Sequence, residues 1–396
     1  MKKILLVNKS FELGGIQSSM INMANELCQH YEVHLFLYNP AGVMKERLNS
    51  SVKVLDSTWR FNCLGMPFKA VIQTKEIKMI AFRVFAALWS KLFSNDFPLK
   101  VAIRHQPQMK DYDLVVAYHQ EQRKKSVVSG FVRVVDRCVE AKRKVAWLHF
   151  DSNTIDLDSR YNNPFYQRMD KLVCVSETLM KNFAKVHTEL SDKMDYCYNF
   201  IPYEAIKQKS MLDQQIAYPV NKFVCFSACR LSEEKALVRA IYAFADILKE
   251  HKDVVWYIAG DGPERSNIET AIKENDLEEY ICLIGAQNNP YPYMRNANLV
   301  LNVSYHEAAP MVFFESKALG TPVFATRTVS AEELLRDQVD SFICDNSAEG
   351  IRNAFALLMA NRELVQNAKK ALEGYHISND KSLLKIKKLL GEKYEY

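Results

Sequence analysis

The stretch SYHEAAPMVFFESKALGTPVFAT, residues 304–326, says the most about the fold of this chain. The run before it, NANLVLNVS (296–304), is typical of a strand buried in a parallel sheet. Pro310 suits the first position of a helix, where its missing N–H costs nothing. We therefore expect Glu307 on a loop and Glu315 on the helix that follows.

This geometry predicts an anion site between the two glutamates. The backbone N–H groups of Met311, Val312 and Phe313 would have no partner inside the helix and would point toward a ligand. Two carboxylates beside such a site indicate a ligand that carries both hydroxyls and phosphates.

Short apolar runs alternate with helix-length segments along the whole chain, which is typical of parallel sheets with crossover helices. The first half contains a helix over 18–30 and the strands KKILLVN, EVHLFLY, DLVVAYH, KVAWLH and KLVCVS. The second contains helices over 233–251, 265–275 and 291–296 and the strands FVCFSAC, VVWYIAG, YICLIG and LVLNVS. The fold class is α/β, with two Rossmann-like doubly wound domains facing a cleft.

A polar stretch without periodicity, residues 198–222, marks the boundary between the domains. We expect an N-terminal domain over 1–200, a C-terminal domain over 201–375 and a C-terminal helix within 376–396 that packs back on the first domain. The length of 396 residues supports two domains of this size.

Cysteine usage and the N-terminus indicate a cytoplasmic protein. Nine cysteines at irregular spacing, with no C-x-x-C, argue against a disulfide framework or a zinc site. MKKILLV is too short an apolar run for a signal peptide, and no uncharged run reaches the roughly 20 residues that span a bilayer.

Charge differs between the halves. Residues 1–200 hold 29 Lys and Arg against 20 Asp and Glu, whereas residues 201–396 hold 23 against 27. The positive field of the first half favours an anionic surface as its partner, either a membrane or nucleic acid. No basic motif with interleaved aromatic residues is present, so we expect no nucleic-acid binding.

Ligands of open α/β sheets bind beyond the carboxyl ends of the strands, so the residues after each strand are the candidates. In the first half these are Gly14 and Gly15, which allow close approach to the backbone, and His149, which suits a sugar hydroxyl or a leaving group. His119 has a similar placement and is the less favoured histidine. Each of these residues also has an ordinary structural interpretation.

The second half offers two cations and two glycine loops. Arg230 and Lys235 follow the strand FVCFSAC and flank Ser232, a possible helix N-cap. A guanidinium fork and an ammonium suit a diphosphate, although Glu233 and Glu234 could equally neutralise both. GDGPE (260–264) and the loop from Gly285 would line a base pocket or form plain turns.

In this order, the motifs resemble glycosyltransferase family four, with the GT-B fold. The similar segments are ELGGIQSSMINMANEL, ACRLSEEK, IAGDGPE, GAQNNPYPYMRNANLVLNVS and, most specifically, HEAAPMVFFESKALGTPVFAT with its E-x7-E pattern. The resemblance runs over nearly the whole chain.

The resemblance implies a retaining, metal-independent transferase that needs no cofactor and uses a nucleotide diphosphate sugar, with UDP favoured. Glu315 would hold the ribose and Glu307 the donor sugar. Arg230 and Lys235 would bind the diphosphate, with His149 near the donor sugar. Gly14, Gly15, Gly285, Ala308, Pro310, Met311 and Val312 complete the expected donor-binding set.

Several positions depart from the family pattern. Cys229, Ala236 and Ala308 stand where relatives usually have glycine, and Ser316 and Lys317 replace small residues. Since the charged positions are present, we interpret these departures as an altered donor fit.

An aromatic stripe within residues 68–104 favours a membrane-associated acceptor, such as a lipid-linked saccharide in capsule or exopolysaccharide assembly, at the inner face of the cell membrane. The stripe consists of Phe82, Phe85, Trp89, Leu92 and Phe93, with Lys75, Lys78, Arg83 and Lys91 around it and the basic run 123–125 further along. The alternative is a helix that faces the core. For the whole chain, the alternatives are a non-catalytic partner of a transferase and a nucleotide-sugar epimerase.

Overall fold

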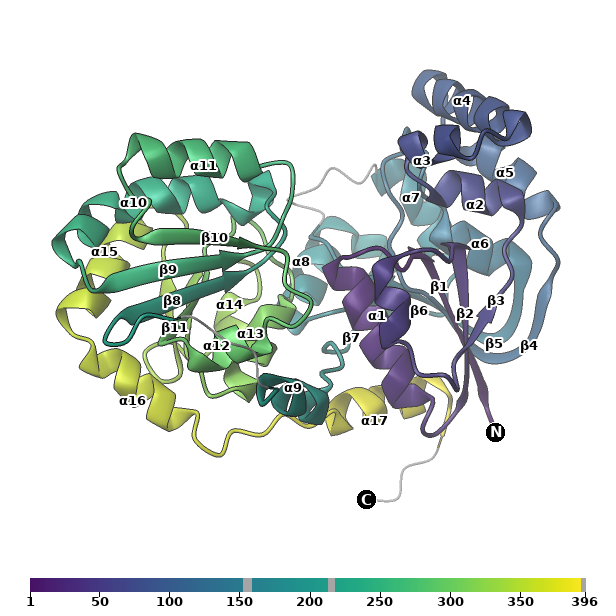
Figure 1. Cartoon of the computed structure of the whole chain (residues 1–396). Coiled ribbons are helices and arrows are strands. Elements are labelled where there is room, and N and C mark those ends of the chain that lie inside the picture. Colours follow the sequence, from purple (N-terminus) through teal and green to yellow (C-terminus); the bar gives the residue numbers. More distant parts are fainter. Residues whose placement is uncertain (152–158, 213–217, 393–396) are drawn as a thin grey trace. The chain divides into compact units, whose positions relative to one another are not determined.

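The chain folds into two compact units, each a parallel sheet covered by helices (Figure 1). The computed structural model describes residues 1–151, 159–212 and 218–392. The first unit comprises Met1–Phe200 and the described end of the chain from Asn379, and the second comprises Ile201–Ser378.

The first unit contains a seven-stranded sheet in the order β3-β2-β1-β4-β5-β6-β7, and every pairing is parallel. Its strands are β1 (Lys3–Ser10), β2 (Glu32–Asn39), β3 (Lys53–Leu55), β4 (Met109–Ala117), β5 (Val139–Leu148), β6 (Lys171–Cys174) and β7 (Met194–Tyr196). The central strands are nearly continuous buried apolar runs because helices cover the sheet.

The helices of the first unit include a group of four between β3 and β4, α2 to α5, for which the described part of the second unit has no counterpart. The α-helices are α1 (Gly15–Leu27), α2 (Trp59–Gly65), α3 (Phe68–Gln73), α4 (Ile77–Leu92), α5 (Asp96–Arg104), α6 (Phe131–Cys138), α7 (Ser159–Tyr166), α8 (Glu177–Val186) and α17 (Asp380–Leu389), and the 3₁₀ helices are η1 (Val43–Arg47) and η2 (Thr188–Lys193). The end of the chain is tied to this unit by Lys385, whose Nζ lies 2.6 Å from Asp195.

The second unit contains a six-stranded parallel sheet in the order β10-β9-β8-β11-β12-β13. Its strands are β8 (Phe223–Ala228), β9 (Val254–Ala259), β10 (Ile281–Gly285), β11 (Leu299–Asn302), β12 (Val323–Thr326) and β13 (Ser341–Cys344). One large core cluster lies between the sheet and the helices that follow β8, β9 and β13.

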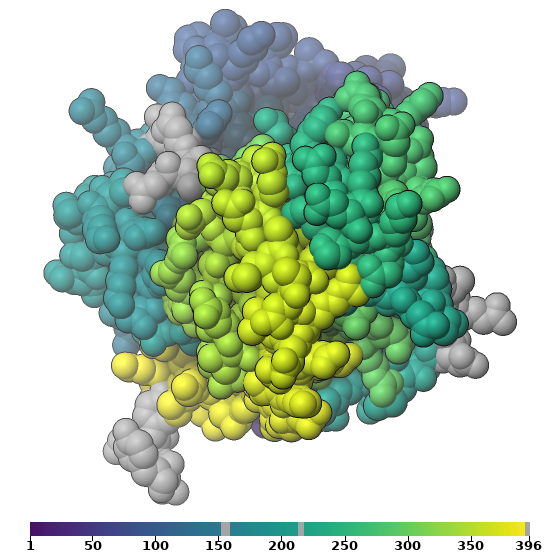
Figure 2. Space-filling view, turned by 90° about the vertical axis from the view of Figure 1, so that its left-hand side faces the viewer, coloured from purple at the N-terminus to yellow at the C-terminus, as the bar shows by residue number. Residues whose placement is uncertain are grey.

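The helices of the second unit are α9 (Tyr203–Ser210), η3 (Glu233–Lys235), α10 (Leu237–Glu250), α11 (Arg265–Glu274), α12 (Tyr291–Asn296), α13 (Met311–Ala318), α14 (Ala331–Leu334), α15 (Ala348–Ala360) and α16 (Glu363–Ala371). Figure 2 shows α16, in yellow, on the surface of this unit.

Some predicted boundaries are wrong. The helix expected over 18–30 begins at Gly15 and ends at Leu27. The polar stretch 198–222 contains α9, which packs Ile206 and Tyr203 into the second unit, while its residues 213–217 lie outside the described ranges. Four short strands, β3, β7, β12 and β13, were not predicted from the sequence. β3 and β7 have only three residues each and no buried apolar run, and β12 and β13 have only four residues each.

Two further features bear on function. Within the described ranges, each helix is too short or too polar to cross a bilayer. All nine cysteines lie in those ranges, and none of them forms a disulfide.

Candidate functional site

The order of the second sheet reverses between β8 and β11, and the loops after these two strands meet there. In open α/β sheets such a switch point is where a ligand binds. Lys235 comes from the loop after β8 and Glu307 from the loop after β11, and Lys235 Nζ lies 2.6 Å from Glu307 Oε1. The structure therefore brings together two of the predicted site residues, 72 positions apart in sequence.

Glu307 is held by three donors on one oxygen. Besides Lys235, the Ser304 hydroxyl donates to Oε1 at 2.9 Å and the Asn302 amide at 3.4 Å. Burial disfavours the Lys235 ammonium, but the charge and the hydrogen bond of Glu307 outweigh burial and raise the pKa of Lys235. Lys235 is therefore cationic at neutral pH.

The backbone of the two loops is also fixed. The Tyr305 N–H donates to the Glu234 carbonyl at 2.9 Å. Arg239, from α10, donates to the Val303 carbonyl at 2.8 Å, and its guanidinium lies 4.2 Å from the centre of the Tyr305 ring. The Lys235–Glu307 pair is thus anchored by main-chain and side-chain contacts on both sides.

The loop that carries Arg230 is positioned by the glycines of GDGPE. A Cβ added at Gly260 would lie 1.9 Å from the Cys229 carbonyl oxygen, and one at Gly262 would lie 2.2 Å from the Leu231 oxygen. Leu231 exchanges hydrogen bonds with this turn, donating to the Asp261 carbonyl and accepting from the Glu264 N–H, both at 3.0 Å. These glycines therefore hold the neighbouring loop.

Arg230 itself is exposed, and within the described ranges it has no ion-pair partner. Glu234 accepts a hydrogen bond from the Ser232 hydroxyl at 2.6 Å. Burial raises the pKa of Glu234, but its hydrogen bonds and the charges of Lys235 and Arg230 outweigh burial and lower that pKa. Gly285, which accepts from the Gly260 N–H at 2.9 Å, has a left-handed φ of 72° and open space beside it. The exposed Arg230 guanidinium can therefore meet an anion from solvent.

Ala236 has a backbone conformation that glycine adopts more easily than alanine. Its φ of 52° and ψ of 30° are left-handed, and it is buried between η3 and α10. The helix predicted over 233–251 is broken here, and Ser232 does not cap it with its side chain. A left-handed alanine costs about 1 kcal/mol or more relative to glycine.

Pro310 precedes α13 as its N-cap, one position earlier than predicted, with Glu307 on the loop and Glu315 within the helix. The Phe313 N–H donates to the Pro310 carbonyl at 3.2 Å, so the prediction that it is free is wrong. The first turn of α13 is thus hydrogen-bonded to the Pro310 carbonyl. Glu315 accepts a hydrogen bond from the buried Tyr291 hydroxyl at 3.1 Å.

Ser316 and Lys317 face the interior and pack the far side of α13. The Ser316 hydroxyl donates to the Thr321 carbonyl at 2.7 Å. Lys317 is buried, with its Nζ 3.2 Å from Asp340 and also hydrogen-bonded to the Leu334 carbonyl. Ser316 and Lys317, which replace the family's small residues, therefore stabilise α13 through contacts inside the second unit.

In the first unit, Gly14 and Gly15 lie at the carboxyl end of β1, where α1 begins. A Cβ added at Gly15 would meet nothing within 4 Å, whereas one at Gly14 would lie 2.4 Å from the flexible end of Gln17. The backbone at Gly15 therefore faces open space.

His149 follows β5 in the same unit and is buried. Burial, and secondarily the neighbouring His119, lower the pKa of His149 to about 3, so the ring is neutral at pH 7. Its Nε2 has no hydrogen-bond partner within the described ranges. Gln120 accepts from the His149 backbone N–H at 2.8 Å and thereby fixes the loop. His119 stacks on Phe131, with ring centres 4.8 Å apart.

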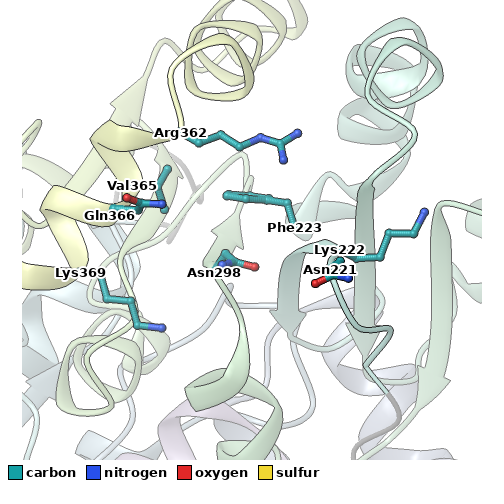
Figure 3. Close-up of a pocket in the computed structure, with 8 residues that line it drawn as sticks. All are labelled: Asn221, Lys222, Phe223, Asn298, Arg362, Val365, Gln366 and Lys369. Atoms are coloured by element: carbon teal, nitrogen blue, oxygen red, sulfur yellow. The ribbon is translucent and has the colours of Figure 1, made fainter.

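Two pockets of the second unit lie away from this site. Figure 3 shows one of about 230 Å³, in which Arg362 and Lys369 flank Phe223 and Asn298. Phe223 begins β8 and Asn298 precedes β11, so this pocket is at the amino ends of the strands. A second, of about 510 Å³, lies at the C-terminal end of α13 beside Gly320.

Sequence patterns missed the residues that support the site. Asn302, Ser304 and Tyr291 hold the two glutamates, and Arg239 anchors their loop. Asn302 is the last residue of β11 and Ser304 lies two positions beyond it. This place at the carboxyl end of a strand is the one local signal that could have marked them as candidates. Nothing local marks Tyr291, because its role depends on where α12 packs.

Comparison with known families gives a match for the second unit. Residues 208–373 match the family described as Glycosyl transferases group 1. A 204-residue stretch is 23% identical to N-acetyl-alpha-D-glucosaminyl L-malate synthase of Bacillus anthracis and covers 51% of this chain and 53% of that protein. The chain thus spans about half the length of this relative.

Another relative is N-acetylgalactosamine-N,N'-diacetylbacillosaminyl-diphospho-undecaprenol 4-alpha-N-acetylgalactosaminyltransferase of Campylobacter jejuni. It is 31% identical over 173 residues, which cover 43% of this chain and 46% of that protein.

Solved structures match over almost the whole chain. Anabaena Alr3699/HepE in complex with UDP superposes with a TM-score of 0.70 at 18% identity, covering 99% of this chain and 100% of that one. A mutant of S. aureus TarM, in complex with fondaparinux, alpha-GlcNAc-glycerol and UDP, gives a TM-score of 0.68 at 13% identity, covering 99% of this chain and 100% of that one. The fold predicted from the sequence, two Rossmann-like domains of the GT-B type, is confirmed.

Proposed function

Because residues 208–373 match the family described as Glycosyl transferases group 1, and the chain has the GT-B fold, we propose that this protein is a retaining glycosyltransferase. The donor is a nucleotide diphosphate sugar, with UDP as the favoured nucleotide. The observation that carries this proposal is the Lys235–Glu307 pair at the switch point of the second sheet, with the exposed Arg230 on the same loop as Lys235.

The site residues divide the donor between them. Arg230 and Lys235 bind the diphosphate, since a guanidinium fork and an ammonium together neutralise its charge. Glu307 accepts hydrogen bonds from the donor sugar, and Glu315 holds the ribose. Tyr291 orients Glu315 through its hydroxyl, 3.1 Å away. Two UDP complexes among the similar structures support the choice of nucleotide.

In the reaction, an acceptor hydroxyl attacks the anomeric carbon from the face that the diphosphate leaves. The C–O bond to the phosphate breaks, the new glycosidic bond forms, and the departing phosphate takes the hydroxyl proton. Arg230 and Lys235 stabilise the negative charge on the leaving group, so no metal ion is needed. Neutral His149 serves as a hydrogen-bond partner of the donor sugar.

We propose that the acceptor is a lipid-linked saccharide in bacterial surface polysaccharide assembly, used at the inner face of the cell membrane. The relative from C. jejuni, whose name includes a diphospho-undecaprenol acceptor, supports this choice.

The test is release of nucleoside diphosphate by the purified protein, given UDP-, GDP- or ADP-sugars and a lipid extract. We expect release with one donor, dependence on the extract, and an unchanged rate in EDTA. No release with any donor would favour a non-catalytic partner, and conversion of the donor sugar without release would favour an epimerase. A rate abolished by EDTA and restored by a divalent cation would contradict metal independence.

A further inference from the structure

The outer face of α4 in the first unit is apolar and uncovered. Its exposed apolar residues are Ile77, Ala81, Val84, Leu88 and Leu92, and we call them the α4 face. They recur at helical spacing, so they form one stripe. Leu88 is 57% exposed and Leu92 is 71% exposed, values unusual for leucines on a continuous stripe.

The buried side of α4 explains which way this stripe points. Met79, Arg83, Ala86 and Ser90 are buried. At 100° per residue, their centre lies about 180° from the centre of the α4 face. The helix therefore packs on the unit with one side and turns a second apolar side fully away from it.

This arrangement corrects the stripe expected from the sequence. Phe82 packs on Trp59, with ring centres 5.6 Å apart, and is partly buried. Arg83 is buried and donates to the Leu64 carbonyl at 3.1 Å, so it is not a surface cation. Of the predicted stripe, Leu92 and Phe93 are exposed, and Phe97 of α5 extends the apolar surface beside them.

Cations lie beside the α4 face. Lys78 and Lys91 are on either side of the stripe at helical periodicity, but Lys78 is paired with Glu76 at 3.2 Å, so Lys91 is the lysine of α4 that is available to an anionic surface. The basic run 123–125 is tied to the end of α4, because the Asn95 N–H donates to the Lys124 carbonyl at 2.8 Å and its amide to the Arg123 carbonyl at 3.3 Å. Asn95 lies two residues from both Phe93 and Phe97.

We propose that the α4 face docks on an anionic lipid surface, with its leucines and Phe93 in the apolar layer and Lys91 and Lys125 at the headgroups. An apolar stripe flanked by lysines matches such a surface in both polarity and charge. Figure 1 shows α4 as the outermost helix of the group α2–α5. This inference rests on the proposed function, because a lipid-linked acceptor lies in a membrane.

The experiment is flotation of the full-length protein with vesicles of phosphatidylcholine alone or with about one third phosphatidylglycerol. We expect binding to the anionic vesicles and weak binding to the neutral ones. Leu92→Glu should lower the partition coefficient about tenfold or more. The matched control is Leu357→Glu, a leucine of α15 that is 62% exposed, which should leave partitioning unchanged.

Lys91→Gln and Lys125→Gln test the electrostatic part, and each should lower binding about fivefold at low salt. Equal binding of wild type and Leu92→Glu, or equal binding to both vesicle types, would overturn the proposal. Sedimentation without lipid would overturn it as well if it shows a dimer that Leu92→Glu dissociates. Nucleoside diphosphate binding, measured on the same samples, separates a failure of docking from a failure of the donor site.

Discussion

At Ala236 the backbone has a conformation that favours glycine, but the residue is an alanine. Its left-handed φ of 52° is needed because η3 must turn directly into α10. A glycine would adopt this conformation at little cost. The alanine therefore stores strain beside Lys235, which it directly follows.

We predict that Ala236→Gly raises the free energy of unfolding by about 1 kcal/mol. The control is Ala356→Gly within α15, where glycine should lower the free energy of unfolding by about 1 kcal/mol. Thermal or urea unfolding measures both. A destabilised Ala236→Gly variant would show that the alanine methyl contributes more by packing than it costs in strain.

Glu307 neutralises Lys235 when no donor is bound, so a diphosphate must compete with a carboxylate that lies 2.6 Å from the ammonium. We predict that Glu307→Gln binds nucleoside diphosphate about tenfold more tightly while it lowers transfer more than 100-fold. Calorimetry and a turnover assay give the two values. Weaker binding in this variant would mean that Glu307 positions Lys235 for the ligand and does not compete with it.

His149 makes stability depend on pH. The pKa of His149 in the folded chain, about 3, lies below the ordinary value of about 6.5. Between these two pH values the His149 ring binds a proton in the unfolded chain but not in the folded chain. Its contribution to stability is complete above pH 6.5 and is lost as the pH falls toward 3. We predict that His149→Phe loses less thermal stability than wild type between pH 7 and pH 5.

A His30→Phe variant serves as the control, because the His30 side chain is exposed. It should follow the wild-type pH dependence. If His149→Phe also follows the wild-type curve, the buried ring does not contribute to acid lability.

At the scale of elements, the turn after β9 determines where the loop after β8 lies. Gly262→Ala would place a Cβ 2.2 Å from the Leu231 oxygen and push away the loop that carries Arg230. We predict a loss of about 1–3 kcal/mol of stability together with weaker nucleoside diphosphate binding. Gly374→Ala, which adds a methyl in open space at a φ of 73°, should lose stability alone. Equal affinity in both variants would contradict the positioning role.

The elements that could be predicted from sequence are those with a continuous apolar run, such as β1, β8 and β11. The break at Ala236 could not be predicted, because EEKALVRA has a normal helical pattern. Nor could the Lys235–Glu307 contact be derived from local pattern, because it depends on the pairing of β8 with β11 across 72 residues. Family resemblance marked both residues as site residues but not their mutual contact.

At the scale of the whole molecule, the two units contribute different chemistry. The second provides charged groups at the switch point of its sheet, at Arg230, Lys235 and Glu307. The first provides an open glycine backbone at Gly15, a neutral buried His149 and the apolar α4 face. In the proposed function, the charged groups of the second unit bind the donor, and the α4 face of the first unit meets the lipid surface.

The most direct test of the donor site is calorimetric titration of the full-length protein with UDP. The account predicts that UDP binds the wild type and that Glu315→Gln, which removes the carboxylate held by Tyr291, weakens binding about tenfold or more. Glu363→Gln, on an exposed turn of α16, should bind like the wild type. Equal affinity of Glu315→Gln and the wild type, or no binding of UDP, GDP or ADP, would contradict the account.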